Sequence, residues 1–170
     1  NVQIATENQF ITNYGLYSSP TDQGTLKPFL ESFKERYGTQ SATVCADSGY
    51  GREMNYEYMI SEEITPFVKY NMFHAEMKRK RKNNPFLIEN MFYNKELDFY
   101  VCPMGQRLEF VGTKKETSDL GYTSTKSLYQ AKDCSNCPLR GMCYKGKCRT
   151  RTIEVNHRNN ELRAMARELL

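Results

Sequence analysis

Strand-like and helix-like segments alternate over the first 70 residues, and this alternation limits the fold more than any other feature of the sequence. Residues 2–5 and 10–17 are β-rich and meet at a turn at Asn8 and Gln9, which predicts an antiparallel hairpin. Apolar residues then recur at helical spacing over residues 25–37, and Gly38 ends that helix. The following segments predict a buried central strand, a short helix and another strand over residues 42–46, 52–60 and 64–70. We therefore expect an α/β layered core.

Beyond residue 70 the pattern changes to short β-rich pieces joined by polar segments. The pieces are residues 91–93, 98–102, 107–111 and 127–130, and the polar residues 114–125 predict a hairpin loop. We interpret residues 71–151 as an inserted β-rich subdomain. Residues 152–170 then return to the core, with a strand at 153–155 and a helix whose apolar stripe includes Leu162 and Ala166.

Length and hydropathy exclude several classes of protein. The chain has 170 residues, which suits one domain or one domain with a large insertion. Its mean hydropathy is -0.73 and no apolar run approaches the ~18 residues of a spanning helix, so a transmembrane protein is excluded. The chain starts at Asn1 without Met or a signal core, and we expect a piece of a longer protein. P-loop, dinucleotide and Ser-His-Asp patterns are absent.

The modest net charge of +4 hides an uneven distribution. Residues 70–151 hold 16 Lys and Arg against 8 Asp and Glu, whereas the flanks hold 8 against 12. Such a basic region is the electrostatic footprint of a polyanion, most often nucleic acid, although a solvated loop or a localisation signal has the same composition. The candidate DNA-binding residues are Lys78, Arg79, Lys80, Arg81, Lys82, Arg140, Lys145, Lys147 and Arg149.

Asp47 is the candidate catalytic residue. It follows the strand at 42–46 and precedes the glycine-containing turn Ser48-Gly49-Tyr50-Gly51. Open α/β sheets place their ligands at the carboxyl ends of such strands, and carboxylates are hard ligands for divalent cations. A purely structural role as the cap of the next helix is the alternative.

The segment Val44-Cys45-Ala46-Asp47-Ser48-Gly49-Tyr50-Gly51 resembles a block of bacterial insertion-sequence transposases of the DDE type, in which this Asp is the second of three acids. Several further segments agree with the same family in order along nearly the whole chain. They are Asn1 to Ala5, Pro20-Thr21-Asp22, Phe67 to Asn71, Cys102-Pro103 with Gly105 to Leu108, and Cys134 to Cys143.

The resemblance implies a ribonuclease-H-like core, a mixed sheet with helices, that is partial here and is interrupted by the cysteine-containing subdomain. Residues 1–70 would form its first part, and residues 152–170 would return to it. It implies Mg²⁺ or Mn²⁺ at Asp47, DNA as transposon ends and target, self-association in the active complex, and a bacterial, cytoplasmic, nucleoid-associated location.

The implied activity is metal-dependent strand cleavage and strand transfer in transposition. Neither Glu7 nor Asp22 matches the first acid of the family, and Glu161 and Glu168 precede the place of its last acid. We therefore expect residues 1–170 to be inactive alone. The alternatives are a non-catalytic DNA-binding module that uses the basic subdomain, and a decayed or domesticated element.

Four of the six cysteines lie within the fifteen residues from 134 to 148. A C-x2-C pair supplies two ligands of a tetrahedral zinc site. We predict Zn²⁺ at Cys102, Cys134, Cys137 and Cys143, preferring Cys102 to Cys148 because Cys102-Pro103-Met104-Gly105 predicts a knuckle-like turn and because the resemblance includes it. An iron-sulfur cluster, and disulfides or free thiols, remain alternatives.

The remaining candidates are assigned no chemistry. Cys148 would be a spare thiol, Cys45 a small buried side chain in its strand, and His74 and His157 surface residues.

Overall fold

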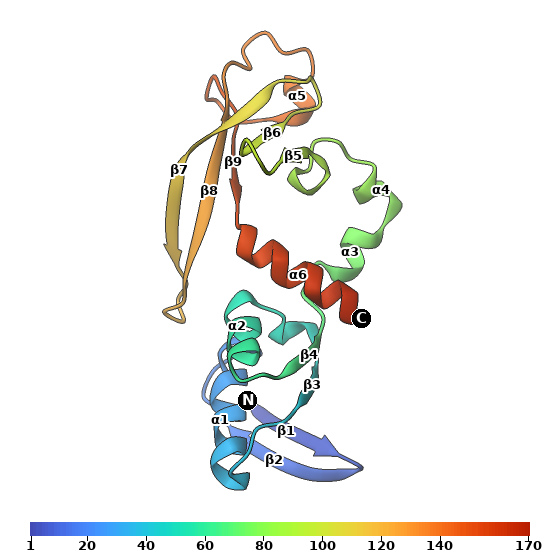
Figure 1. Ribbon diagram of the computed structural model, residues 1–170, viewed down its shortest axis with the longest axis vertical. Coiled ribbons are helices and arrows are strands. Elements are labelled where there is room, and N and C mark those ends of the chain that lie inside the picture. Colours follow the sequence, from blue (N-terminus) through green and yellow to red (C-terminus); the bar gives the residue numbers. More distant parts are fainter. The chain divides into compact units, whose positions relative to one another are not determined.

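The computed structural model describes residues 1–170 and divides the chain into two compact units (Figure 1). The first unit comprises residues 1–73 and 158–170, and the second unit comprises residues 74–157. The sequence placed these boundaries at residues 70 and 151.

The first unit contains two separate pairs of strands with helices packed on them. Strands β1 (Val2–Glu7) and β2 (Phe10–Leu16) form an antiparallel hairpin, and both turn residues, Asn8 and Gln9, have positive φ. Strands β3 (Thr43–Ala46) and β4 (Thr65–Val68) pair in parallel. The two pairs are not hydrogen-bonded into one sheet, so the structure does not confirm the predicted ribonuclease-H-like mixed sheet.

Helices of the first unit follow the predicted pattern. Helix α1 (Leu26–Tyr37) ends at Gly38, whose left-handed conformation a side chain would strain. Helix α2 (Glu53–Ser61) links β3 to β4, and α6 (His157–Leu169) is the last helix of the chain. The short 3-10 turns η1 (Asp22–Gly24) and η2 (Ser48–Tyr50) precede α1 and α2, respectively. The apolar core gathers residues of α1, α2, β4 and α6, including Leu30, Tyr56, Met59, Val68 and Leu162.

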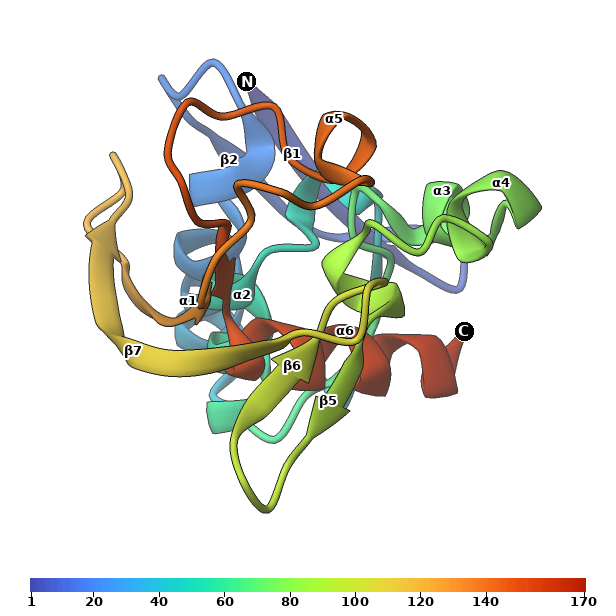
Figure 2. The same ribbon diagram turned by 90° about the horizontal axis from the view of Figure 1, so that it is seen from above.

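The second unit is built on one five-stranded antiparallel sheet in the order β5-β6-β7-β8-β9. Strands β5, β6 and β7 of this sheet are labelled in Figure 2. The strands are β5 (Phe92–Asn94), β6 (Phe99–Val101), β7 (Arg107–Thr117), β8 (Thr123–Ala131) and β9 (Thr152–Val155). Its short helices are α3 (Phe73–Met77), α4 (Arg79–Lys82), η3 (Ile88–Asn90) and α5 (Arg140–Cys143). The structure is thus mixed α and β, with mostly antiparallel pairing.

Three sequence predictions about strands are wrong. Residues 114–125 are not a loop, because β7 and β8 continue as a paired ribbon up to Thr117 and Thr123. The strand at 153–155 does not pair with the core strands and is instead the edge strand β9. Strand β3 is not a buried central strand. It pairs with β4 alone, and Cys45 on it is exposed.

None of the helices combines the length and apolar character that a membrane crossing would require.

Candidate functional site

Asp47 lies where the sequence predicted it, directly after β3 and before η2. Its extended backbone lets the carboxylate turn back, and the Ser48 backbone N–H donates to Asp47 Oδ1 at 2.5 Å. Asp47 thus caps the short turn η2, whereas the residue before the next helix, α2, is Arg52, so the predicted alternative of a cap for that helix is wrong. The residue is exposed and lines a cavity of about 710 Å³ in the first unit. Capping and ligand binding are compatible, because the bond to Ser48 uses Oδ1 and not Oδ2.

The turn that follows Asp47 is held by a close approach of two backbones. A Cβ atom on Gly51 would overlap the backbone carbonyl oxygen of Lys69, just after β4. The buried Asn55 donates its amide to the carbonyls of Tyr50, at 2.9 Å, and Gln23, at 3.2 Å. The glycine and the buried amide therefore fix the turn relative to the rest of the first unit.

A second carboxylate, Asp22, lies beside this turn, which the sequence did not predict. Asp22 Oδ1 accepts from Asn1 Nδ2 at 2.6 Å and from Gln3 Nε2 at 2.9 Å, while the Tyr50 hydroxyl donates to Gln3 Oε1. Burial raises the pKa of Tyr50, and the negative charge of Asp22 and, to a smaller extent, that of Asp47 raise it further. No sequence pattern links these residues, because the contacts join β1, η1 and η2.

Residues 1–170 do not complete a metal site in the structure. No group of three or more His, Cys, Asp or Glu side chains is close enough together to hold a metal ion. A carboxylate site for Mg²⁺ needs more oxygen ligands than Asp47 supplies.

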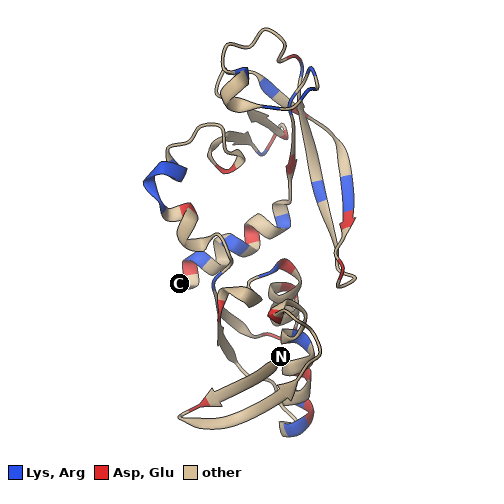
Figure 3. Cartoon of the chain, turned by 180° about the vertical axis from the view of Figure 1, so that it is seen from behind, with Lys and Arg blue, Asp and Glu red and all other residues tan.

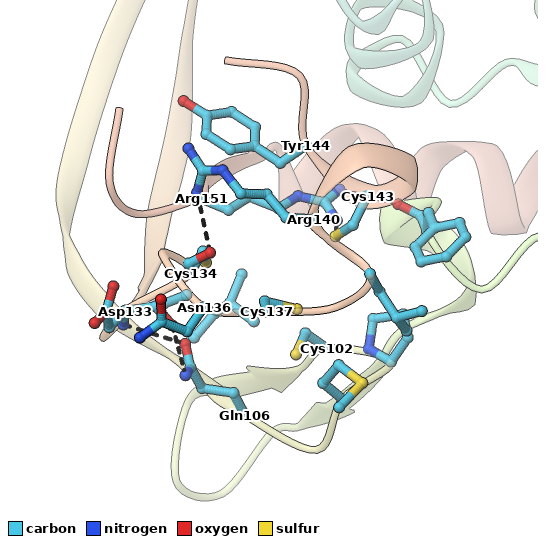
Figure 4. A pocket seen from close by; sticks show the side chains of 16 residues that line it. Cys102, Gln106, Asp133, Cys134, Asn136, Cys137, Arg140, Cys143, Tyr144 and Arg151 are labelled. Atoms are coloured by element: carbon cyan, nitrogen blue, oxygen red, sulfur yellow. Dashed lines mark hydrogen bonds between the residues drawn. The ribbon is translucent and has the colours of Figure 1, made fainter. Parts of the chain in front are cut away.

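The four predicted zinc ligands line one cavity in the second unit (Figure 4), which we call the cysteine cavity. It measures about 340 Å³ and also borders Phe86, Met104, Leu108 and Arg151. Cys102 comes from the end of β6, and the other three come from residues 132–151, which we call the cysteine loop. All six cysteines of the chain are free thiols, and Cys148 is exposed.

The basic residues differ in how far they are already engaged. The guanidinium of Arg140 donates to the carbonyl oxygens of Cys134, Gly146, Cys148 and Arg149. This side chain therefore braces the cysteine loop from within, and its predicted contact with DNA stays a prediction. Arg149 forms a two-point ion pair with Asp133, at 3.2 and 3.0 Å, and holds the pKa of that carboxyl well below its usual range.

The run from Lys78 to Lys82 forms α4 and the residue before it, coloured blue in Figure 3. Its four lysines and arginines other than Arg81 are exposed. Arg81 pairs with Glu89 at 2.6 Å. Lys145 and Lys147 are also exposed. The structure therefore presents most of the predicted cations to solvent, in two separate segments of the second unit.

His157 is not the surface residue that the sequence predicted. Its Nε2 lies 2.8 Å from the hydroxyl of the buried Tyr129, and that hydroxyl also donates to Asp98 Oδ1 at 2.7 Å. Tyr93 donates to the same oxygen, and its ring stacks on Tyr100. Hydrogen bonds from Tyr129 and Tyr93 hold the pKa of Asp98 below its ordinary value.

The carboxyl-terminal part of the chain matches a known protein family. Residues 101–170 match the family described as "Transposase DDE domain". The match supports a DDE-type transposase, as the resemblance predicted, and does not show the bacterial origin that the resemblance also implied. It covers the cysteine cavity, β7 to β9 and α6, whereas Asp47 lies outside it. No curated protein and no solved structure matches the chain.

Proposed function

We propose that the chain is part of a transposase that cleaves DNA strands at transposon ends and joins them to target DNA, with Asp47 as one of three catalytic carboxylates. The family match supports a transposase-type function and DNA as the substrate. The observation that carries the role of Asp47 is its position: an exposed carboxylate directly after a β-strand, on a turn fixed by Gly51 and Asn55, bordering a cavity.

The chemistry of this proposal needs divalent cations. Such ions, held by several carboxylates, activate the attacking oxygen and stabilise the leaving oxygen in phosphoryl transfer on DNA. Asp47 would supply one oxygen ligand for Mg²⁺ or Mn²⁺, and the complete protein would supply the others within a ribonuclease-H-like core. That core, self-association in the active complex and the inactivity of residues 1–170 alone remain predictions.

DNA would bind to the exposed cations of the second unit. Lys78, Arg79, Lys80 and Lys82 around α4, together with Lys145 and Lys147, are the candidates for phosphate contacts. Phosphate contacts carry no sequence preference and weaken steeply with salt. A non-catalytic DNA-binding module is the second candidate, since these same residues would serve it without Asp47.

The test is an end-cleavage assay with the complete protein, Mg²⁺ and linear DNA that carries the terminal sequences of its own element. We expect Asp47→Asn to abolish cleavage while DNA binding at low salt is unchanged, because the amide keeps the shape but loses the charge that holds the metal. Glu63→Gln, an exchange of the same chemistry at a residue that does not border the Asp47 cavity, is the matched control. Full cleavage by Asp47→Asn would rule out the catalytic assignment and leave the binding module.

A further inference from the structure

The cysteine cavity combines two tight turns, four thiols and two guanidinium groups. We propose that it is a structural zinc site, with Cys102, Cys134, Cys137 and Cys143 as ligands, and that Arg140 and Arg151 hold the cysteine loop around the metal. This role goes beyond strand cleavage and does not depend on it.

The side chain of Gln106 connects the turn at Cys102 to the turn at Cys134. Gln106 follows the turn at Cys102, and its amide group donates to the Asp133 carbonyl at 2.9 Å and accepts from the Asp133 backbone N–H at 3.4 Å. Asp133 directly precedes Cys134. Two segments 27 residues apart are thereby held in register beside the cavity. No local pattern in the sequence predicts this contact.

Each turn is closed by backbone hydrogen bonds. At the first, the Cys102 N–H donates to the Gln106 carbonyl at 2.9 Å and the Gly105 N–H donates to the Cys102 carbonyl at 2.8 Å; Gly105 has φ +77°. At the second, the Cys137 N–H points to the Cys134 carbonyl at 3.4 Å and the Arg140 N–H donates to the Cys137 carbonyl at 3.1 Å. The second turn presents the two thiols of the C-x2-C pair Cys134 and Cys137 to one ion, whereas the first presents the single thiol of Cys102.

The third ligand segment is held by the two arginines. Arg151 Nη1 donates to Cys143 Sγ at 2.8 Å, while its Nη2 donates to the Phe86 carbonyl at 2.9 Å. The Arg140 guanidinium donates hydrogen bonds to the carbonyl oxygens of Gly146 and Cys148. Zinc bound to four thiolates carries a net charge of -2, and two guanidinium groups beside the site offset that charge. Hydrogen bonds to ligand sulfur from such outer groups are a regular part of metal sites.

Cys148 is not a ligand in this proposal. It is exposed and does not line the cavity. Cys102, by contrast, packs with Cys134 against the apolar cluster of the second unit. No three of these thiols lie close enough together in the structure to hold an ion, so zinc binding in this proposal needs the cysteine side chains to adopt other rotamers.

The experiment measures metal content and thiol protection in the protein purified without chelators under reducing, anaerobic conditions. We expect about one equivalent of zinc. Zinc should protect Cys102, Cys134, Cys137 and Cys143 from alkylation, as read by mass spectrometry, and leave Cys45 and Cys148 reactive. Replacement of zinc by Co²⁺ should give the intense visible absorption of a tetrahedral thiolate site.

Variants separate the ligands from the bystanders. Cys102→Ser should lose the bound zinc, whereas the matched controls Cys148→Ser and Cys45→Ser should keep it. Arg151→Gln should weaken zinc binding by about 10- to 100-fold, as other losses of an outer-shell group do. The protection pattern of the unaltered protein needs no variant and so stands even if Cys102→Ser fails to fold.

Three results would overturn the proposal. They are a reduced protein that binds no stoichiometric zinc, a brown protein that contains iron and sulfide at these cysteines, and a protection pattern that includes Cys148 in place of Cys102. None of them bears on strand cleavage, because no step of the measurement uses DNA.

Discussion

The two units hold their candidate sites in different ways. The turn at Asp47 rests on a unit whose core joins four elements around side chains such as Tyr56, Met59 and Leu162, all at most 1% exposed. The cysteine loop has a short helix, α5, with no buried residue, and is held by hydrogen bonds from Arg140, Arg151 and Gln106. Apolar burial thus stabilises one site, whereas the other depends on polar bonds and, in our proposal, on a metal.

The largest expected effect follows from removing zinc. Chelation should raise the rate of amide hydrogen exchange in residues 132–151 by about a thousandfold. Zinc at a thousandfold excess over its Kd stabilises the folded loop by about 4 kcal/mol, and chelation removes that stabilisation. Exchange in α2 and β4 should not change, since no predicted zinc ligand lies there. Equal exchange in the cysteine loop with and without chelator would show that the polar bonds alone hold it.

A smaller effect is expected from adding a Cβ atom at Gly51, where two backbone segments pack closely. Gly51→Ala should lower the free energy of unfolding by about 1 to 3 kcal/mol, since its Cβ meets the Lys69 backbone, which cannot turn aside as a flexible side chain would. Urea unfolding measures this difference.

Two other glycines serve as controls for Gly51. A Cβ on Gly49, in the same turn, would lie 3.7 Å from Asp22 Oδ2, an ordinary contact, and one on Gly141 in α5 would meet nothing within 4 Å. Both alanine variants should keep the stability of the unaltered chain or gain up to about 1 kcal/mol. A Gly51→Ala variant as stable as these would contradict the fixed turn.

The smallest effect concerns the charge of Asp98 in the second unit. Because its pKa is lowered in the folded state, the stabilisation is present above the unfolded pKa of about 3.9 and is lost as the pH falls through the folded value. Asp98→Asn should cost about 1 kcal/mol at pH 7, and this cost should shrink as the pH falls below about 4.

Asn is a suitable replacement because Asp98 has φ +49°, which Asn tolerates, and because its side-chain oxygen still accepts from Tyr93 and Tyr129. The exposed Glu109→Gln is the control and should change stability by no more than about 0.5 kcal/mol. A cost of Asp98→Asn that is the same at pH 3 and pH 7 would mean that the charge of Asp98 contributes nothing.

The sequence predicted what depends on local pattern. The hairpin, α1 with its end at Gly38, α2, β4 and α6 all follow from periodicity and turn residues, and Asp47 lies at the predicted strand end. The spacing of Cys134, Cys137 and Cys143, with Cys102, likewise identified residues that line one cavity.

The failures depend on contacts between distant segments. Lysines and threonines suit an exposed two-stranded ribbon as well as a loop, so the polar composition of residues 114–125 does not distinguish the two. The exposure of Cys45 depends on which strands pair with β3, and the bracing role of Arg140 depends on where the carbonyls of residues 146–149 fall. No local pattern encodes such pairings, since they are decided by packing across the whole unit.

The central claim, that Asp47 holds a catalytic metal, is tested most directly by changing the ligand atom and the metal together. In the complete protein, Asp47→Cys should fail to cleave transposon ends with Mg²⁺, which prefers oxygen, and should regain cleavage with Mn²⁺, which accepts the softer thiolate more readily. Asp47→Cys that cleaves with Mg²⁺ as fast as the unaltered protein would contradict the claim.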